Sequence, residues 1–391
     1  MTDIRSPRLI TLILMTAATT LSLNMFLPSL PAIAQAFDVP YGTATLAIGG
    51  YLAMTAVLAL IIGPVSDRIG RRPTAIACVT LFLLASLGCV MAQSWAWFLI
   101  CRLAQGVMVS GYILANAVVR DTRDQTGAAS LLGYIAGAMA IAPLLGPMLG
   151  GVLQDAFGWR ANFYLYAALA GLLLIAILTD LSETRARRSG PKPGPGPLLR
   201  APRFWAYALT VALSTCAFYG FLAGAPIVAA QTYGLSGTTL GIGLGSITAG
   251  FMAGSFTGAR LSRRLGPDRV MIAGRLISVT GLAIGALTLG LLPPTPLALF
   301  AFTIFIGIGN GLTTPTANAG ALSVMPDLAG SAAGFTGALT VGLGAIATTV
   351  IGWTMTALPT PTALLTALLA IKLTSLATAW IAWRTAPASS C

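Results

Sequence analysis

Histidine is absent from this sequence, and charged residues make up only 8% of its 391 residues, whereas hydrophobic residues make up 56%. A soluble domain carries roughly 25% charged residues, so this composition cannot build a water-soluble surface. Apolar runs of about 20 residues, each long enough to cross a hydrocarbon core roughly 30 Å thick, recur along the chain. We therefore expect an all-α integral membrane protein, with the lipid bilayer as its main solvent.

The sequence also lacks the residue clusters that metal sites and enzymes need. Four of the 5 cysteines lie in apolar runs and the other is the last residue, so no outside set is available for disulfides or a metal. No nucleophile stands beside an obvious base. We expect no metal, no cofactor and no catalytic residue, and a membrane enzyme is a weak alternative.

Twelve apolar segments have the length of membrane-spanning helices. We place them at residues 9–31, 43–64, 74–92, 96–118, 128–153, 159–181, 204–230, 238–260, 270–291, 296–322, 331–353 and 360–383. A basic stretch rich in Pro and Gly, residues 183–203, has too little apolar content to fold. The sequence therefore predicts an N-terminal six-helix bundle at residues 1–182, a cytoplasmic linker at 183–203 and a C-terminal six-helix bundle at 204–391.

The formal net charge of +12 would suggest a nucleic-acid partner in a soluble protein, so the placement of the charges decides its meaning. Most Lys and Arg residues fall in alternate loops, and Arg160 alone lies in a loop on the opposite side. Cytoplasmic loops of membrane proteins carry an excess of Lys and Arg. We therefore expect an inner (plasma) membrane protein with both termini in the cytoplasm and no nucleic-acid partner.

The two predicted halves resemble each other. The string "FLPSLPAIA" from Phe26 is similar to "FLAGAPIVA" from Phe221, and "DRIGRR" from Asp67 is similar to "ARLSRR" from Ala259. Such matches indicate that one six-helix unit was duplicated in parallel orientation. We expect two pseudo-symmetric bundles.

The string "GPVSDRIGRR" stands between the second and third predicted spans. Its two glycines permit close packing and a tight turn, and its aspartate offers an acceptor to an arginine or a helix N-terminus. Alternatively, this segment is an ordinary basic loop whose charges only fix the orientation of the chain in the membrane. Its residues of interest are Gly63, Asp67, Arg68, Gly70, Arg71 and Arg72.

This spacing resembles the signature loop of the major facilitator superfamily. The resemblance implies the twelve-helix fold of that superfamily and a cytoplasmic latch. In that latch Asp67 would meet Arg120 and the start of the eleventh helix near Gly330 and Ser331. Making and breaking the latch would accompany alternating access.

The fourth predicted span contains the string "RLAQG", which begins at Arg102. An arginine within a span costs about 2.5–3.5 kcal/mol on insertion scales, so Arg102 should face the bundle interior or a wet cavity, unless it snorkels to the interface. At about 100° per residue, Asn116 returns to the same side of the helix and extends a polar stripe. The string resembles the fourth-helix motif of drug:proton antiporters, which implies a link between this arginine and proton transfer.

The fifth predicted span combines proline and glycine. Each proline removes a helix hydrogen bond and the glycines leave a groove, so this helix should bend and pack closely on a neighbour. The pattern looks like the antiporter motif of exporting members of the superfamily, which implies efflux rather than uptake. Its residues are Gly137, Pro143, Gly146, Pro147, Gly150 and Gly151.

Longer strings carry a narrower resemblance. The strings "NMFLPSLPAIAQAF", "VVRDTRDQTGAA", "YGFLAGAPIV" and "NAGALSVMPDLAGSAAGFTGAL" all look like the Bcr/CflA-type multidrug exporters and their phenicol-resistance relatives. This resemblance implies secondary active export of small hydrophobic or amphiphilic drug-like compounds, usually driven by protons. Export or facilitated transport of an endogenous metabolite such as a sugar or amino acid, without proton coupling, is the alternative; a non-transporting receptor or scaffold is a further one.

One position departs from the pattern of those exporters. They usually carry an aspartate in the first helix where this chain has Asn24, and none of its 10 acidic residues maps to the middle of a span. An amide does not titrate, so Asn24 can bind a substrate but cannot carry a proton. Three explanations remain open: coupling through Asp67 or Asp155 at a helix end, coupling through Lys372 unless that lysine snorkels, or facilitated transport or exchange without protons.

The substrate site of such a protein should lie near the midplane of the membrane. Polar and aromatic residues within the spans are the candidates to line it, although an aromatic side chain there more often packs or faces lipid. We expect a small-molecule substrate and a monomeric protein. The candidate lining residues are Asn24, Tyr51, Arg102, Asn116, Phe218, Tyr219 and Asn310.

Overall fold

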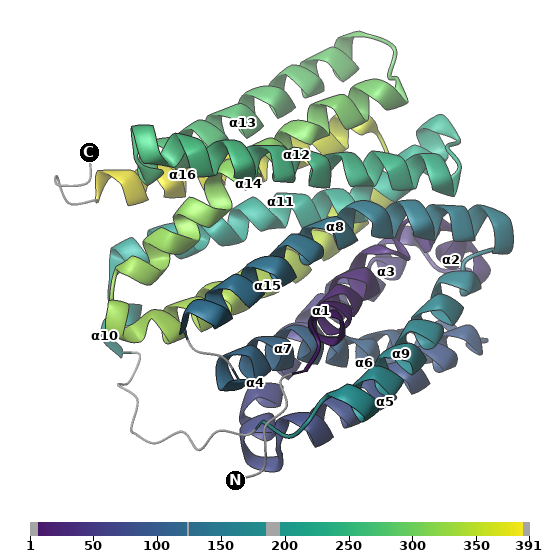
Figure 1. Ribbon diagram of the computed structural model, residues 1–391. Coiled ribbons are helices and arrows are strands. Elements are labelled where there is room, and N and C mark those ends of the chain that lie inside the picture. Colours follow the sequence, from purple (N-terminus) through teal and green to yellow (C-terminus); the bar gives the residue numbers. More distant parts are fainter. Residues whose placement is uncertain (1–6, 123–124, 185–195, 386–391) are drawn as a thin grey trace. The chain divides into compact units, whose positions relative to one another are not determined.

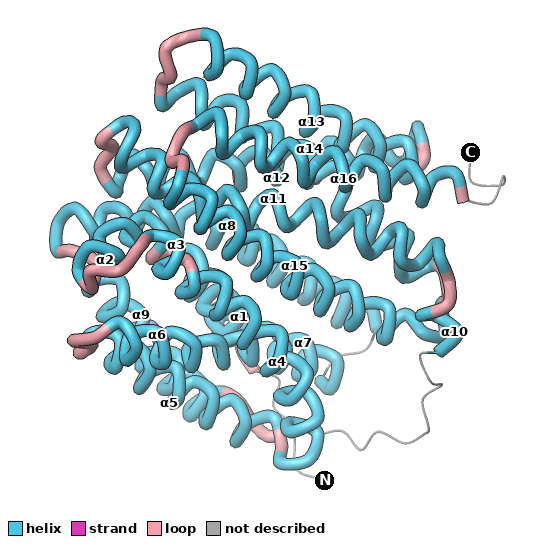
Figure 2. Tube along the Cα trace, turned by 180° about the vertical axis from the view of Figure 1, so that it is seen from behind, coloured by secondary structure: helices cyan, strands magenta, loops and turns pink. Residues whose placement is uncertain are grey.

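The computed structural model describes residues 7–122, 125–184 and 196–385 (Figure 1). Within these ranges every regular element is a helix, as the trace in Figure 2 shows. Eleven helices among the described residues, some formed by consecutive elements, are long and apolar enough to cross a membrane. The remaining expected span contains a shorter apolar stretch, Ile141–Phe157.

The chain divides into two compact units. Unit 1 comprises residues 1–39, 46–189 and 236–241, and unit 2 comprises residues 40–45, 190–235 and 242–391. Two short segments do not follow the predicted halves. Residues 40–45 belong to unit 2, and residues 236–241 belong to unit 1. The predicted linker stays a prediction, since its residues 185–195 lie outside the described residues.

Unit 1 contains the elements of the first six predicted spans. They are α1 (Leu9–Asn24), η1 (Leu27–Ser29), α2 (Leu30–Ala36), α4 (Leu46–Ile69), α5 (Arg71–Val90), α6 (Trp95–Ala104), η2 (Gln105–Met108), α7 (Val109–Thr122), α8 (Gln125–Phe157) and α9 (Arg160–Asp180).

Unit 2 contains the remaining elements, except for the first turn of α12, which belongs to unit 1. They are α3 (Tyr41–Ala44), α10 (Gly196–Leu199), α11 (Pro202–Tyr233), α12 (Gly237–Leu265), α13 (Pro267–Leu291), α14 (Pro296–Ser323), η3 (Pro326–Leu328), α15 (Ala329–Ala357) and α16 (Pro361–Arg384). Helix α11 packs against α14, α15 and α16 and forms the centre of this unit.

The expected loop between the second and third spans is almost entirely helical. Helix α4 continues to Ile69, five residues beyond the predicted end, and α5 begins at Arg71. Gly70 alone separates the two helices and has a φ of +120°, a backbone conformation that favours glycine. The prediction of a loop here was wrong because apolar content falls before the helix ends.

The first span is interrupted in its middle. Helix α1 ends at Asn24, and Pro28 opens the 3₁₀ turn η1 before α2 continues the segment. Proline has no N–H and disfavours a helical conformation of the residue before it, which explains a break at this point. Gly150 of α8 lies directly against the carbonyl group of Met25, so the break and α8 are in backbone contact.

Glycines also bring two helices of unit 2 together. Gly307 and Gly311 of α14 lie against the backbone of α12 at Ile247 and Phe251. Small residues allow such close approach between helices in lipid, where no hydrophobic effect drives their association. The α12–α14 contact therefore depends on the absence of side chains at these positions.

We predict that Gly150→Ala destabilises the protein by about 1–3 kcal/mol, because the new methyl group would overlap the Met25 carbonyl oxygen and the backbone would have to move. Gly171→Ala in α9 is the matched control, since no atom lies within 4 Å of its added Cβ, and alanine favours a helix over glycine by about 1 kcal/mol. Melting temperatures of the two purified variants in detergent test this. Equal melting temperatures would contradict the close packing of α8 on the helix break.

Candidate functional site

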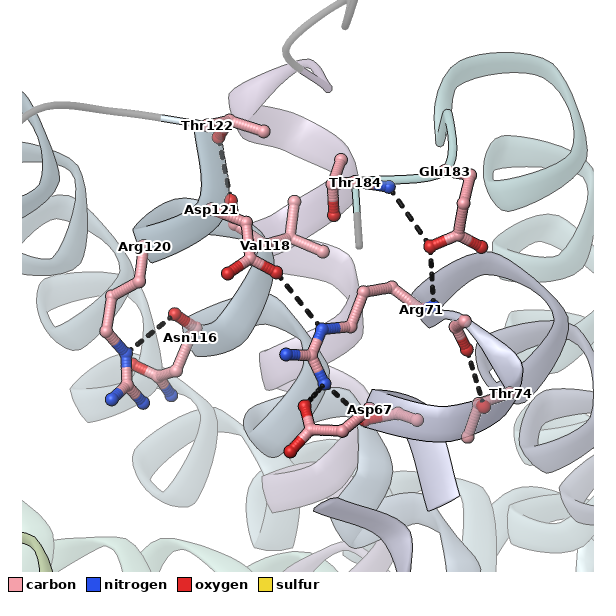
Figure 3. A network of polar contacts seen from close by, with 12 residues as sticks. Asp67, Arg71, Thr74, Asn116, Val118, Arg120, Asp121, Thr122, Glu183 and Thr184 are labelled. Atoms are coloured by element: carbon pink, nitrogen blue, oxygen red, sulfur yellow. Dashed lines mark hydrogen bonds and ion pairs between the residues drawn. The ribbon is translucent and has the colours of Figure 1, made fainter. Parts of the chain in front are cut away.

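A buried arginine organises the ends of α4, α5 and α7 in unit 1 (Figure 3). The Arg71 side chain forms ion pairs with Asp67, at 2.6 Å from Nη1 to Oδ1, and with Asp121, at 3.1 Å from Nε to Oδ2. Its Nη1 also donates to Ser66 Oγ at 2.5 Å. Arg71 is 6% exposed, so these contacts hold a desolvated guanidinium between two carboxylates.

This arrangement differs from the predicted latch. Asp67 pairs with Arg71 rather than with Arg120, whose Nε donates to the carbonyl oxygen of Asn116 at 3.2 Å. The reason is geometric, because Asp67 and Arg71 lie four positions apart across the short Gly70 junction. The expected meeting with Gly330 and Ser331 would join the two units and stays a prediction.

Glu183 holds the first turn of α5. Its carboxylate oxygens accept hydrogen bonds from the backbone N–H of Arg71 at 2.8 Å and of Arg72 at 3.3 Å (Figure 3 labels Glu183 and Arg71). A carboxylate at this place satisfies orphan amide groups and interacts favourably with the helix dipole. Arg72 further donates to the Leu178 carbonyl oxygen, at 2.9 Å, whereas Arg68 is exposed. The end of α9 is thereby fixed to the start of α5.

Arg102 is fully buried in unit 1, so it does not snorkel to the interface. Its nitrogens donate to Ser22 O at 2.8 Å, Ala47 O at 3.2 Å and Gln105 Oε1 at 2.7 Å. The guanidinium also lies over two aromatic rings, with centroids 4.1 Å away at Phe26 and 4.2 Å away at Tyr51. Ring faces stabilise a cation, and more so when it is desolvated.

These contacts account for the backbone groups that the break in the first span exposes. In a continuous helix, the Ser22 carbonyl oxygen would accept a hydrogen bond from the Phe26 N–H. Here it accepts a hydrogen bond from Arg102 Nη2 instead. The Phe26 N–H donates to Tyr166 Oη at 3.2 Å, and that hydroxyl donates to Leu21 O at 3.0 Å. The broken helix is therefore completed by side chains of α6 and α9.

Asn24 and Asn116 lie apart from this network. Asn24 is buried and donates from Nδ2 to Thr20 O at 2.9 Å, while its Oδ1 is buried with no partner among the described residues. Asn116 is half-buried and donates to Tyr112 O at 2.7 Å. The 3₁₀ turn η2 separates Arg102 from Asn116, and no hydrogen bond between them is present in the described part of the chain.

Helix α8 remains one helix through Pro143 and Pro147. Gly151 lies against the backbone of Gly237, at the beginning of α12. Beside it, the Asp155 carboxylate accepts hydrogen bonds from Gly237 N–H and Thr238 N–H, both at 2.8 Å, and from the Thr238 hydroxyl at 2.6 Å. These residues all belong to unit 1. Gly146 faces Leu21, and Gly137 lies in α8 at a place where surrounding side chains are outside the description.

Unit 2 contains a second buried cationic site. Lys372 donates from Nζ to Asn310 Oδ1 at 2.6 Å and to Ser214 O at 3.2 Å. Arg275 donates to the same Asn310 oxygen at 3.0 Å, and to Gly309 O at 2.7 Å and Thr313 Oγ1 at 2.9 Å. Lys372 and Arg275 are both fully buried, so neither reaches the membrane interface.

A cavity of about 480 Å³ lies between α11, α14 and α15 of unit 2. Apolar residues share its wall with four hydroxyls and one amide, and no charged side chain lines it among the described residues. The polar lining residues are Thr215, Thr314, Asn318, Thr336 and Thr340. Phe218 and Tyr219, with ring centroids 5.7 Å apart on α11, are half-buried and do not line it, and neither does Asn310.

The sequence profile of the Major Facilitator Superfamily matches residues 12–349. The chain belongs to this superfamily. It is therefore a multi-pass membrane transporter rather than an enzyme, and the expected all-α fold is confirmed. Members of the superfamily bind small-molecule substrates within the membrane.

Individual members of the superfamily show how far the likeness extends. A Bacillus subtilis (strain 168) protein named "Uncharacterized MFS-type transporter YdgK" is 29% identical over 347 residues, 85% of each chain. "Multidrug resistance protein MdtL" of Salmonella heidelberg (strain SL476) is 29% identical over 289 residues, 72% of each chain. A solved bacterial homolog of the human lysosomal transporter Spinster has a TM-score of 0.81 at 18% identity, covering 97% of this chain and 96% of that one, and shares the fold.

Sequence reasoning missed three residues of these sites. Asp121 and Glu183 lie outside the middle of every predicted span, at positions where an acidic residue is usually solvated, and Arg275, which lies within the predicted span 270–291, was not singled out. The signal for Arg275 was its cost in a lipid-embedded helix, which is the same signal that singled out Arg102. Nothing in the sequence distinguishes Asn318, which lines the cavity, from Asn310, which does not.

We predict that Gly70→Ala disrupts the junction of this transporter between α4 and α5. The substitution places a side chain at a φ of +120° and against the Glu183 carboxylate, so it should cost about 1–3 kcal/mol. Gly63→Ala in the same motif is the control, because no atom lies within 4 Å of its added Cβ. Thermal unfolding of both variants is the measurement. A junction that tolerates alanine at 70 as well as at 63 would refute the role given to Glu183.

Proposed function

We propose that this transporter exports small hydrophobic or amphiphilic drug-like compounds by alternating access, as the Bcr/CflA-type multidrug exporters do. The observation that carries the proposal is the cavity of about 480 Å³ in unit 2. Its volume lies within the range of roughly 300–1,000 Å³ for small-molecule sites, which are mostly apolar with a few placed polar groups. The likeness to a multidrug resistance protein supports the same substrate class.

The alternative, an endogenous sugar or amino acid, fits this lining less well. A sugar presents many hydroxyls, and each buried polar group without a partner costs free energy. The cavity offers five polar side chains, spread over three helices, among apolar ones. A compound with a large apolar part and few polar groups matches this wall better.

We further propose efflux across the cell inner membrane by a monomer, with both termini in the cytoplasm. The packing of α8 through Gly150 and Gly151 supports the antiporter assignment, since both glycines are in backbone contact with other helices. The exposed Arg263 and Arg264 near the end of α12 support the orientation.

Proton coupling is part of the proposal, and Asp155 is the group that we assign to it. Asn24 cannot titrate, and Asp67 is held in an ion pair with Arg71. Asp155 is exposed to solvent and accepts three hydrogen bonds from the first turn of α12. A protonated carboxyl group is a poorer acceptor, so binding a proton would weaken this contact and allow α12 to move.

Expression in a drug-sensitive bacterial host tests the export of drugs. We expect tolerance of several structurally unrelated amphiphilic antimicrobials to rise at least about fourfold in minimum inhibitory concentration. Arg102→Met should abolish this effect, because it leaves the buried Ser22 carbonyl group at the helix break without a donor. Unchanged tolerance, together with altered secretion of a metabolite, would refute the drug assignment.

Proteoliposomes with an imposed pH gradient test the coupling. We expect uphill accumulation of substrate in the wild type, and in Asp155→Asn only downhill transport, because the variant cannot exchange a proton at this position. Asp38→Asn is the matched control, since Asp38 is an exposed carboxylate of unit 1 in a conformation that asparagine also adopts. Uphill accumulation by Asp155→Asn would contradict the assignment.

A further inference from the structure

The buried cations of unit 2 share a single neutral acceptor. Asn310 Oδ1 receives hydrogen bonds from Arg275 at 3.0 Å and from Lys372 at 2.6 Å. The remaining acceptors of both side chains are backbone carbonyl oxygens and the Thr313 hydroxyl. Arg275 Nη1 is buried and has no hydrogen-bond partner among the described residues. The described hydrogen-bond partners of both cations are therefore all neutral.

Among the described side chains of unit 2, no carboxylate forms an ion pair or a hydrogen bond with these cations. The unit contains two acidic residues, Asp268 and Asp327. Asp268 is in the first turn of α13 and accepts a hydrogen bond from the Tyr207 hydroxyl, and Asp327 is in the short turn η3 between α14 and α15. Among the described residues Arg102 also lacks a counter-charge, but each of its nitrogens has an acceptor. A buried guanidinium with an unsatisfied nitrogen is more costly, so its presence in a membrane bundle indicates a function.

The cationic site and the cavity are built on the same two helices. The Ser214 carbonyl oxygen accepts a hydrogen bond from Lys372, and the next residue, Thr215, lines the cavity. Likewise, the Thr313 hydroxyl accepts a hydrogen bond from Arg275, and the next residue, Thr314, lies in the cavity wall. Arg275 contacts the Thr313 side chain, and successive helical residues point about 100° apart, so its guanidinium lies on a different side of α14 from the wall that Thr314 forms.

The cavity also holds a polar group without a partner. Thr336 of α15 lines it, is 4% exposed, and has a hydroxyl that no described residue hydrogen-bonds. A hydroxyl donates as well as accepts, so after rotation of the buried side chain toward the cavity it can bind a carboxylate oxygen of a ligand. The cavity therefore offers a donor and a positive potential, while its polar lining provides no negative charge.

We propose that the cavity of unit 2 binds organic anions, namely amphiphiles with a carboxylate group, and that Arg275 and Lys372 select them over organic cations. This inference rests on the proposed export of amphiphiles and names their charge. Arg275 and Lys372 act through their field and do not touch the ligand, whereas Thr336 donates to it. At an effective dielectric constant of about 20 and a separation of about 10 Å, one such charge changes a binding constant roughly tenfold.

Three probes with one apolar scaffold test the selection by charge. They are biphenyl-4-carboxylate, biphenyl-4-carboxamide and 4-biphenylmethylammonium, whose binding to the full-length protein in lipid nanodiscs is measured at neutral pH. We expect the carboxylate to bind about tenfold more tightly than the amide, and the ammonium compound to bind most weakly. Equal or tighter binding of the ammonium compound would overturn the proposal, and this ranking requires no variant.

Variants then assign the selection to these residues. Arg275→Met should weaken binding of the carboxylate roughly tenfold while changing that of the amide less than about twofold. Arg269→Met is the matched control, since it removes a positive charge from the exposed end of the same helix. Equal loss for carboxylate and amide in Arg275→Met would show a structural role and would overturn the assignment.

Drug tolerance separates this inference from the proposed function. If none of the probes binds but the transporter still raises tolerance of neutral amphiphiles, the anion selectivity is wrong and the export function stands. If no probe binds and tolerance is unchanged, both are wrong. Tight carboxylate binding without drug tolerance would support the anion site and refute the drug assignment.

Discussion

The hydrogen bonds of Arg102 to the interrupted first span are the interaction on which unit 1 depends most. Lipid offers no water to backbone groups, so a helix can break within a membrane only where protein satisfies the freed N–H and C=O groups. Arg102 donates to Ser22 O, and Tyr166 both accepts from Phe26 N–H and donates to Leu21 O. The guanidinium is in turn stabilised by two ring faces and by Gln105. The buried cation thus satisfies a carbonyl group that the break frees, and the break in turn provides an acceptor for the buried cation.

The glycines of α8 follow from this break. Because the Met25 carbonyl group lies directly against α8, this helix needs a position without a side chain there, and Gly150 supplies that position. One turn further, Asp155 accepts three hydrogen bonds from the first turn of α12. The same helix therefore carries a fixed contact and, a short distance away, a contact that depends on the charge of a carboxylate. A helix of this kind can transmit a change at one end without losing its packing at the other.

The sequence was sufficient for the helices and for the burial of their cations, and the physics explains why. Spans follow from apolar length, and an arginine such as Arg102 must find an interior place because lipid excludes it. The partners of these cations were harder to predict. The Ser22 carbonyl oxygen becomes available only because the first span breaks, and no sequence pattern specifies the side-chain geometry at that break. Asp67 was paired with a distant arginine by analogy, whereas the unexpected helical continuation of α4 brings it to Arg71. The direction of a polar side chain on an apolar helix, which separates Asn310 from Asn318, also depends on packing that appears only in three dimensions.

The two buried cationic sites use opposite means to remain folded, and this difference bears on their functions. Each nitrogen of Arg102 has a hydrogen-bond acceptor and two aromatic faces lie against the guanidinium, so its contacts serve the interrupted first span. Arg275 has one nitrogen without a hydrogen-bond partner in the described part of the chain, and it shares its amide acceptor with Lys372. A site whose purpose were packing alone would gain stability by replacing such a pair with apolar side chains. Among the described residues of unit 2 these cations have only neutral partners, and the Thr336 hydroxyl of the neighbouring cavity has none, which favours a ligand that brings a negative charge.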